Sequence, residues 1–227
     1  IHEDLLSFFE TQYSADQMAL AIVSDKTLDE LEAMIAPLFG QIENKDIGPS
    51  YPDIPMYTDA ELPAKLEIQA QKEGARVTYL FPMPSTRELY RNKPENYFSN
   101  LLGHEGSGSL HQLLNSYGWI ESLGASVGEM DRNMSGLSIS IALTPSGRDK
   151  VDEITDLLFQ YVDLIKATPP QEWLYEEQAR VSEIGFRFQE KSSATGLVYQ
   201  LAPRIDEYPP EDLLVAPYLM ANFDAKA

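Results

Sequence analysis

The residues of this 227-residue chain best suited to metal chemistry are its three histidines, His2, His104 and His111. A zinc hydrolase helix places two imidazoles four residues apart, so that both reach one ion, and adds a carboxylate that activates the bound water. Neither His-Glu-x-x-His nor the inverted His-x-x-Glu-His occurs, because Leu6, Gly108 and Asn115 stand where the second histidine would be. We therefore expect His104 to be a loop residue, His111 to lie on a helix surface, and neither to bind a metal.

The glycine-rich segment 103–108 precedes a predicted helix, and it suggests three kinds of chemistry. Backbone amides at a helix N-terminus attract phosphate, but no P-loop Lys-Ser/Thr follows and Glu105 would repel an anion. The segment 106–110 does not fit the Gly-x-Ser-x-Gly elbow of serine hydrolases. A further hypothesis is an independent metal enzyme with a site built from His104, His111 and Glu105. It predicts stoichiometric zinc in the purified fragment. The simplest expectation is a tight turn, followed by a helix that Ser109 and Gln112 begin as a capping box.

The composition excludes several functional classes. The chain has 36 acidic and 17 basic residues, a formal charge of -19, and no cysteine. Without cysteine there is no disulfide scaffold, thiol catalysis or Cys-ligated zinc. Nucleic acids and anionic membranes need clustered Lys and Arg, so we expect no nucleic-acid partner. No apolar run approaches the ~20 residues of a membrane span. The start at Ile1, without an initiator Met or signal peptide, predicts an excised piece of a longer protein.

The first 63 residues are expected to hold a helix, a strand, a second helix and a linker. Apolar residues at helical spacing predict the first helix over 1–12, and the continuous apolar run 18–23 predicts a buried strand. Thr27 and Glu30 form a capping box for a helix that ends near Gly40. Four prolines and no apolar period then predict a linker over 46–63.

The remaining elements alternate in pairs. Alternation over 66–70 and 75–81 predicts a hairpin, and residues 85–88 match a second capping box. We expect strands over 119–129 and 137–143, and helices over 94–102, 109–118, 151–165 and 171–188. Short apolar segments follow at 197–201 and 213–218. Paired strands and paired helices predict an α+β fold, in which an antiparallel sheet has its helices packed on one face.

Several motifs resemble one family in the same order along the chain. The segment 102–110, Leu-Gly-His-Glu-Gly-Ser-Gly-Ser-Leu, followed by Gly118-Trp119, is similar to the second domain of the pitrilysin and insulin-degrading enzyme family of zinc metalloendopeptidases. Phe81-Pro82-Met83-Pro84, Pro170-Gln171-Glu172-Trp173 and Phe186-Arg187-Phe188 also match. The resemblance implies that 1–45 is the C-terminal tail of the preceding catalytic lobe, 46–63 a linker, and 64–227 a second, non-catalytic α+β lobe.

The resemblance also implies where function lies. The family's zinc ligands and general base precede Ile1, so zinc belongs to the full-length parent, and the fragment alone is expected to be inactive. Its expected partners are peptide substrates and the remaining domains of the same chain. The acidic excess either favours basic peptides in the proteolytic chamber or simply solvates the surface. The compartment implied is periplasmic if the source is bacterial, with a cytoplasmic alternative.

In the insulin-degrading branch, the second lobe forms chamber wall and holds the free N-terminal end of a peptide at an exosite. The positions that correspond to this exosite are Gly103, Glu105, Leu123, Gly124 and Ala125. This chain departs from the branch at Asn96 and Asn100, which replace histidines, and at Ala125 and Ser126, which replace glycines. The alternative is a non-catalytic binding or structural subunit that pairs with an active peptidase chain.

Overall fold

The computed structural model describes residues 1–48, 54, 56–58, 60–69 and 74–225. Its contacts divide the chain into two compact units, which are described separately. One contains Ile1–Pro52 and Phe186–Pro217, and the other contains Asp53–Gly185 and Tyr218–Ala227. Within the described residues, no helix combines the length and apolar character needed to cross a membrane.

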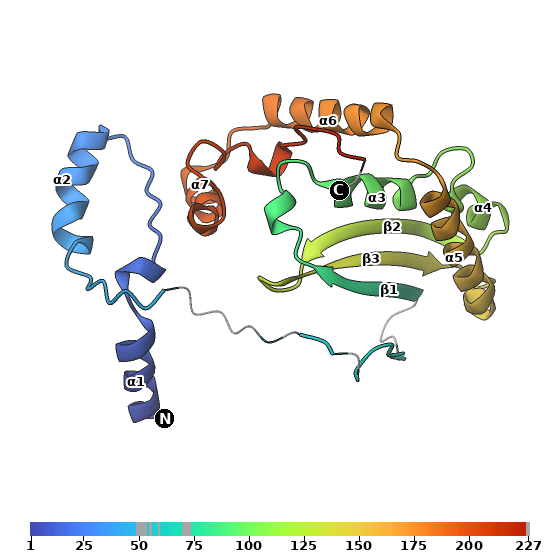
Figure 1. The fold of residues 1–227 in the computed structure, drawn as a ribbon, viewed down its shortest axis with the longest axis horizontal. Coiled ribbons are helices and arrows are strands. Elements are labelled where there is room, and N and C mark those ends of the chain that lie inside the picture. Colours follow the sequence, from blue (N-terminus) through green and yellow to red (C-terminus); the bar gives the residue numbers. More distant parts are fainter. Residues whose placement is uncertain (49–53, 55, 59, 70–73, 226–227) are drawn as a thin grey trace. The chain divides into compact units, whose positions relative to one another are not determined.

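Three antiparallel strands form the sheet of the second unit, in the order β1-β3-β2 (Figure 1). The strands are β1 (Ala75–Pro84), β2 (Ile120–Glu129) and β3 (Met134–Leu143). β3 pairs with both neighbours, so β1 and β2 are edge strands of the described sheet. An edge strand presents a row of main-chain N–H and C=O groups that its own sheet does not use.

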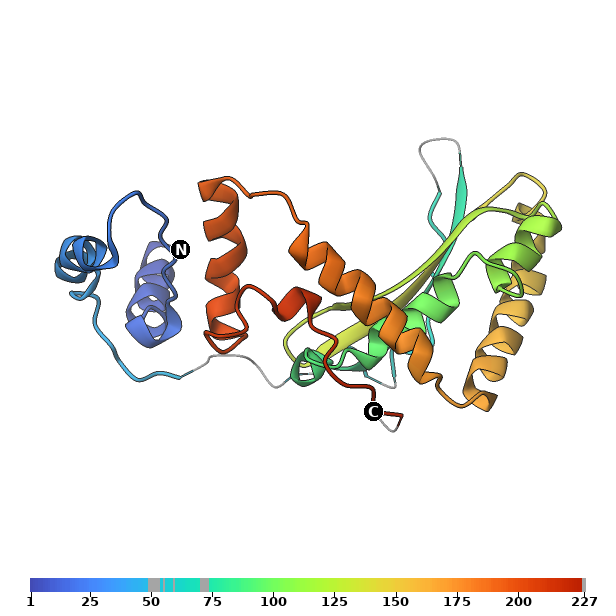
Figure 2. The ribbon, with the colours of Figure 1, turned by 90° about the horizontal axis from the view of Figure 1, so that it is seen from above.

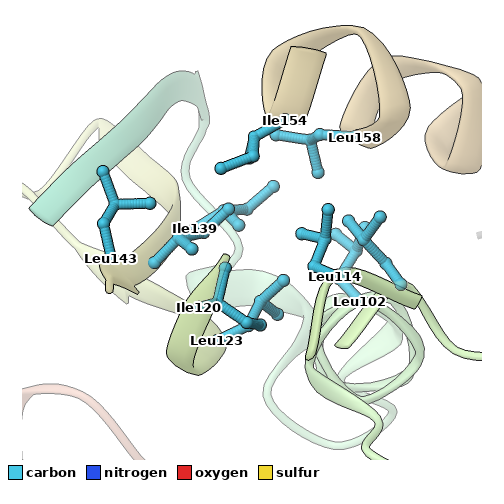
Figure 3. Packing of buried hydrophobic residues seen from close by; sticks show 10 residues of the cluster. Leu102, Leu114, Ile120, Leu123, Ile139, Leu143, Ile154 and Leu158 are labelled. Carbon is cyan, nitrogen blue, oxygen red and sulfur yellow. The ribbon is translucent and has the colours of Figure 1, made fainter. Parts of the chain in front are cut away.

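Strict alternation along β3 gives the sheet one apolar and one polar face. Ile139 and Ile141 are fully buried, whereas the neighbouring Ser138 and Ser140 lie on the opposite face. The apolar face is covered by α3 (Pro94–Gly103), α4 (Leu110–Ser116) and α5 (Val151–Ala167). Figure 3 shows the resulting core, in which side chains of these helices meet those of the sheet. The predicted α+β fold, with helices packed on one face of an antiparallel sheet, is confirmed.

Local signals set the limits of these helices. Pro94 occupies the first turn of α3, where its missing N–H costs nothing. The hydroxyl of Ser109 accepts a hydrogen bond of 3.1 Å from the backbone N–H of Gln112 at the start of α4. Gly118 follows that helix with φ +70°, a conformation that L side chains rarely adopt. α6 (Glu172–Arg187) then begins after Pro169 and Pro170, as the sequence predicts.

The predicted hairpin is wrong in its first half. Residues 66–69 form no strand, and Leu66 and Ile68 are 82% and 79% exposed, while 70–73 lie outside the described residues. The second capping box is also wrong, because residues 87–89 form a single 3₁₀ turn without a side-chain cap. The backbone N–H of Thr86 instead donates to Oγ of Ser135, whose complete burial demands a partner.

The first unit contains α1 (His2–Gln12), α2 (Leu28–Phe39) and α7 (Ala194–Leu201). The predicted capping box of α2 is present: Thr27 N–H donates to Glu30 Oε2 over 2.9 Å, and Glu30 N–H donates to Thr27 Oγ1 over 3.3 Å. Lys45 N–H donates to Oγ of the buried Ser14, which holds the segment after α2 against the end of α1.

The buried strand predicted over 18–23 is not formed. Met18, Leu20 and Val23 are 44%, 48% and 44% exposed, and the segment pairs with no described strand. An extended segment becomes a strand only when its main-chain groups find a neighbouring strand. The apolar run therefore indicates that these side chains should be buried, but the described residues of this chain do not cover them.

Candidate functional site

A groove of about 920 Å³ lies in the second unit between α3 with its following loop, the edge strand β2, and α6. Its lining residues are Asn96, Ser99, Asn100, Leu101, Gly103, His104, Glu105, Gly124, Ala125, Leu174, Glu177, Gln178, Val181, Ser182 and Met220. Figures 1 and 2 show that α3 lies beside β2 and that α6 lies over α3, on the side of the sheet away from β1. A volume of this size can hold several residues of an extended peptide.

The strand wall of the groove is a free edge. β2 bonds to β3 along one side, and no described backbone group outside the sheet bonds to residues 121–128. At Gly124 an added Cβ would meet nothing within 4 Å, so the face of the sheet is open there. The main-chain groups of this segment that face away from β3 therefore have no described backbone partner.

The second wall has two glycines with little space beside them, Gly103 against the backbone of β2 and Gly106 against the side chain of His104. A Cβ added to Gly103 would lie 3.3 Å from the backbone nitrogen of Ala125, so glycine lets the end of α3 approach β2 closely. A Cβ added to Gly106 would overlap the imidazole of His104. The glycines therefore fix the path of the loop that carries Glu105 along the groove.

The third wall is α6, which is fixed by hydrogen bonds to distant parts of the same unit. Tyr175 Oη donates to the carbonyl of Asn92 over 2.7 Å, and Gln171 N–H donates to Tyr97 Oη over 2.8 Å. Burial raises the pKa of the Tyr175 phenol, so it remains a neutral donor at physiological pH. These bonds hold α6 against α3 and set the width of the groove.

The C-terminal segment supports α6 from its other end. Ser182 Oγ donates to the carbonyl of Tyr218 over 2.8 Å, and Ala221 N–H donates to the carbonyl of Arg91 over 2.7 Å. The rings of Tyr175 and Phe223 lie 5.7 Å apart. This segment places Met220 at the groove as an apolar lining residue.

The groove is acidic. Glu105 and Glu177 line it, and no Lys or Arg occurs among its described lining residues. Neither carboxylate forms an ion pair with a described residue. Nε2 of Gln178 is buried without a hydrogen-bond partner in the described structure. The groove therefore offers negative charge to an occupant.

The structure brings together four of the five residues to which the resemblance points. Gly103, Glu105, Gly124 and Ala125 line the groove. The side chain of Leu123 is 5% exposed and belongs to the core, so its backbone is the part that faces the strand edge. The sequence did not identify the α6 wall. Leu174, Gln178 and Val181 share one helix face by their spacing, but spacing does not say which strand that face meets.

The glycine-rich segment forms a turn and the start of α4. In the described residues, no group of three or more His, Cys, Asp or Glu side chains could hold a metal ion, so this chain's donor set does not fit the family's zinc site. The backbone N–H of Gly108 donates to Gln112 Oε1 over 2.8 Å, while Ser109 caps the helix. The expected Ser109 cap is present, with the glutamine bonded one residue earlier than a capping box requires.

Comparisons with known proteins agree on one family. Residues 1–181 match the family model described as "Peptidase M16 inactive domain". The chain is 33% identical over 220 residues to insulin-degrading enzyme of Drosophila melanogaster and 32% identical over 224 residues to that of Homo sapiens. These alignments cover 96% and 98% of the chain but 22% of each relative.

A crystal structure of pitrilysin has the same fold. It superimposes with a TM-score of 0.88 at 27% sequence identity and covers 99% of this chain, which corresponds to 24% of the pitrilysin chain. The chain thus spans about a fifth to a quarter of the length of these proteins. It belongs to the insulin-degrading enzyme and pitrilysin family, in the part that the peptidase M16 inactive domain describes.

Proposed function

We propose that this chain is the non-catalytic second lobe of a zinc metalloendopeptidase and that its groove anchors the N-terminal end of a peptide substrate. The observation that carries the proposal is the groove of about 920 Å³, which borders the free edge of β2 and is lined by four of the five expected exosite residues. The catalytic zinc and its ligands belong to the parent, as the name "Putative zinc protease" of one relative from Schizosaccharomyces pombe supports.

The anchoring has two parts. The peptide adds a strand beside β2, so that main-chain hydrogen bonds bind it without reading its sequence. Glu105, in the loop beside that edge, receives the terminal ammonium group, whose charge it complements. Ala125 stands where the insulin-degrading branch has glycine, and its methyl group narrows the space for the peptide backbone. At the neighbouring Gly124 the face of the sheet is open, because an added Cβ would meet nothing within 4 Å.

The polar face of the sheet forms part of the chamber wall in this proposal. Small side chains, including Ser122, Ser126, Ser138 and Ser140, occupy that face. A flat surface of hydroxyl groups can face unfolded peptide without trapping it, because it offers hydrogen bonds but little apolar area.

Residues 1–45 belong, in the same proposal, to the fold of the preceding catalytic lobe. Leu5, Phe8 and Phe9 are 63%, 57% and 58% exposed on α1, and Leu28 and Leu38 are 83% and 68% exposed on α2. Such large apolar side chains are normally covered. The strands and helices of the preceding lobe supply the cover, including strand partners for residues 18–23.

The test compares two peptides in the full-length parent after a chelator has removed its metal to stop hydrolysis. The peptides carry a dye at the C-terminus and differ only in acetylation of the amino group. We expect the free amine to bind about fivefold more tightly, as an exposed ion pair allows, and Glu105→Gln to abolish that difference. Glu88→Gln is the matched control, because Glu88 is an exposed carboxylate outside both the groove and the edge of β2. Equal affinity of the two peptides for the unmodified protein would refute anchoring.

A further inference from the structure

We infer that Glu177 makes the groove select peptides with a lysine or arginine within their first three residues. The inference rests on the proposed peptide-anchoring function and adds a second determinant on a different wall. Glu177 lies on α6, whereas Glu105 lies in the loop after α3, and both line the same groove. The free edge of β2 forms another wall of the groove, and the peptide would lie between that edge and α6.

The two carboxylates meet different parts of an extended peptide. A peptide paired with the β2 edge has its backbone in line with the sheet, and its side chains stand perpendicular to it. The loop carrying Glu105 adjoins the strand itself, since Gly103 approaches Ala125. Glu177 lies on α6, a different wall of the groove, and in this inference it meets the side chains of the peptide.

The surroundings of Glu177 suit a long cationic side chain. Leu174 and Val181 on the same helix give apolar contact for methylene groups, and Gln178 adds polar character. No Lys or Arg among the described lining residues neutralises the two acids. A guanidinium or ammonium group of the peptide would therefore meet the Glu177 carboxylate, which has no described ion-pair partner. An acidic side chain of the peptide at the same place would be repelled.

The alternation of a strand makes the selection depend on position. Successive side chains point to opposite faces, so an arginine reaches α6 from one of two neighbouring peptide positions and not from the other. Attraction by the overall charge of -19 would show no such alternation. Position dependence thus separates a contact with Glu177 from the general field of the protein.

The experiment uses the metal-stripped, full-length parent and a set of C-terminally labelled peptides with free amino termini. The set carries arginine, its neutral isostere citrulline, or glutamate at position 2 or at position 3. We expect arginine to bind about three- to fivefold more tightly than citrulline at one of these positions and glutamate to bind more weakly. Glu177→Gln should abolish the preference but leave the discrimination against acetylated peptides unchanged.

Glu176→Gln is the matched control, because it removes the same charge one residue away. Glu176 pairs with Arg180 over 3.0 Å and does not line the groove. A preference for arginine that survives Glu177→Gln, falls equally with Glu176→Gln, or is the same at both positions would overturn the inference. If the unmodified parent shows no arginine preference but still discriminates against acetylated peptides, this inference alone is contradicted. Absence of both preferences contradicts the proposed function as well.

Discussion

Glu95 is a carboxylate held in an unfavourable environment at the start of α3. Its Oε2 is buried and has no hydrogen-bond partner in the described structure. Burial raises the pKa of Glu95 above its usual value near 4.5, and the neighbouring Lys93 only partly opposes that shift. Burial also lowers the pKa of Lys93, and the Tyr175 phenol near Glu95 is kept neutral. The free-energy cost of burying the Glu95 carboxylate is therefore only partly compensated.

The stability that follows from Glu95 depends on pH. A pKa raised by folding contributes stability below the unfolded pKa, and this contribution is lost as pH rises through the folded pKa. Near pH 7 the unfolded carboxylate is ionised, so burial of the group, which disfavours its charged form, opposes folding. We predict that Glu95→Gln increases the free energy of unfolding at pH 7 and has a smaller or opposite effect at pH 4. Urea denaturation at both pH values measures this.

Glu121→Gln serves as the comparison at an exposed position of β2. It should change the free energy of unfolding little at either pH, because the side chain is solvated in both states. A Glu95→Gln variant that is less stable than the unmodified protein at pH 7 would show that Glu95 has a favourable partner in solution.

At the scale of elements, the cap of α4 connects the groove loop to the core. Ser109 is 4% exposed, and its hydroxyl is the side-chain acceptor at the start of a helix that carries the buried Leu110 and Leu114. We predict that Ser109→Ala lowers the free energy of unfolding by about 1 kcal/mol, the usual effect of losing an N-cap. Ser107→Ala, at an exposed position of the same loop, should change it by less than about 0.5 kcal/mol. Denaturant titration distinguishes the two, and equal losses would contradict the role of the cap.

Elements whose pattern is complete within their own segment were predicted correctly. The spacing of Ile154 and Leu158 gave α5, and the alternation around Ile139 and Ile141 gave β3, because these side chains meet the core of the same unit. The same kind of signal failed for residues 18–23 and 66–69. Their apolar side chains are exposed, and their main chains pair with no described strand. The pattern indicates that these segments need a packing partner, but it does not identify that partner.

The groove was predictable only in part for the same reason. Gly103 and Glu105 lie within one continuous motif, so the resemblance located them directly. Glu177 lies on an ordinary amphipathic helix, and what brings it to the groove is the bond between Tyr175 and Asn92, 83 residues apart in the sequence. Contacts over such separations depend on the packed fold and leave no local period.

At the scale of the whole molecule, the chain combines a unit with its own core and a unit rich in exposed apolar side chains. The buried cluster around Leu114, Ile141 and Leu158 belongs to the second unit, which also holds the groove. The exposed side chains of α1 and α2 belong to the first. Under the proposed function, peptide anchoring falls to the second unit and contact with the preceding lobe to the first.

The measurement that tests the central claim most directly is amide hydrogen exchange of the metal-stripped parent with and without a free-amine peptide. Peptide addition to the strand edge predicts slower exchange in residues 121–128 of β2. The opposite edge strand, β1, should not change, and it provides a control within the same sheet. A peptide that binds while the exchange of β2 stays unaltered, or that protects β1 instead, would contradict the account.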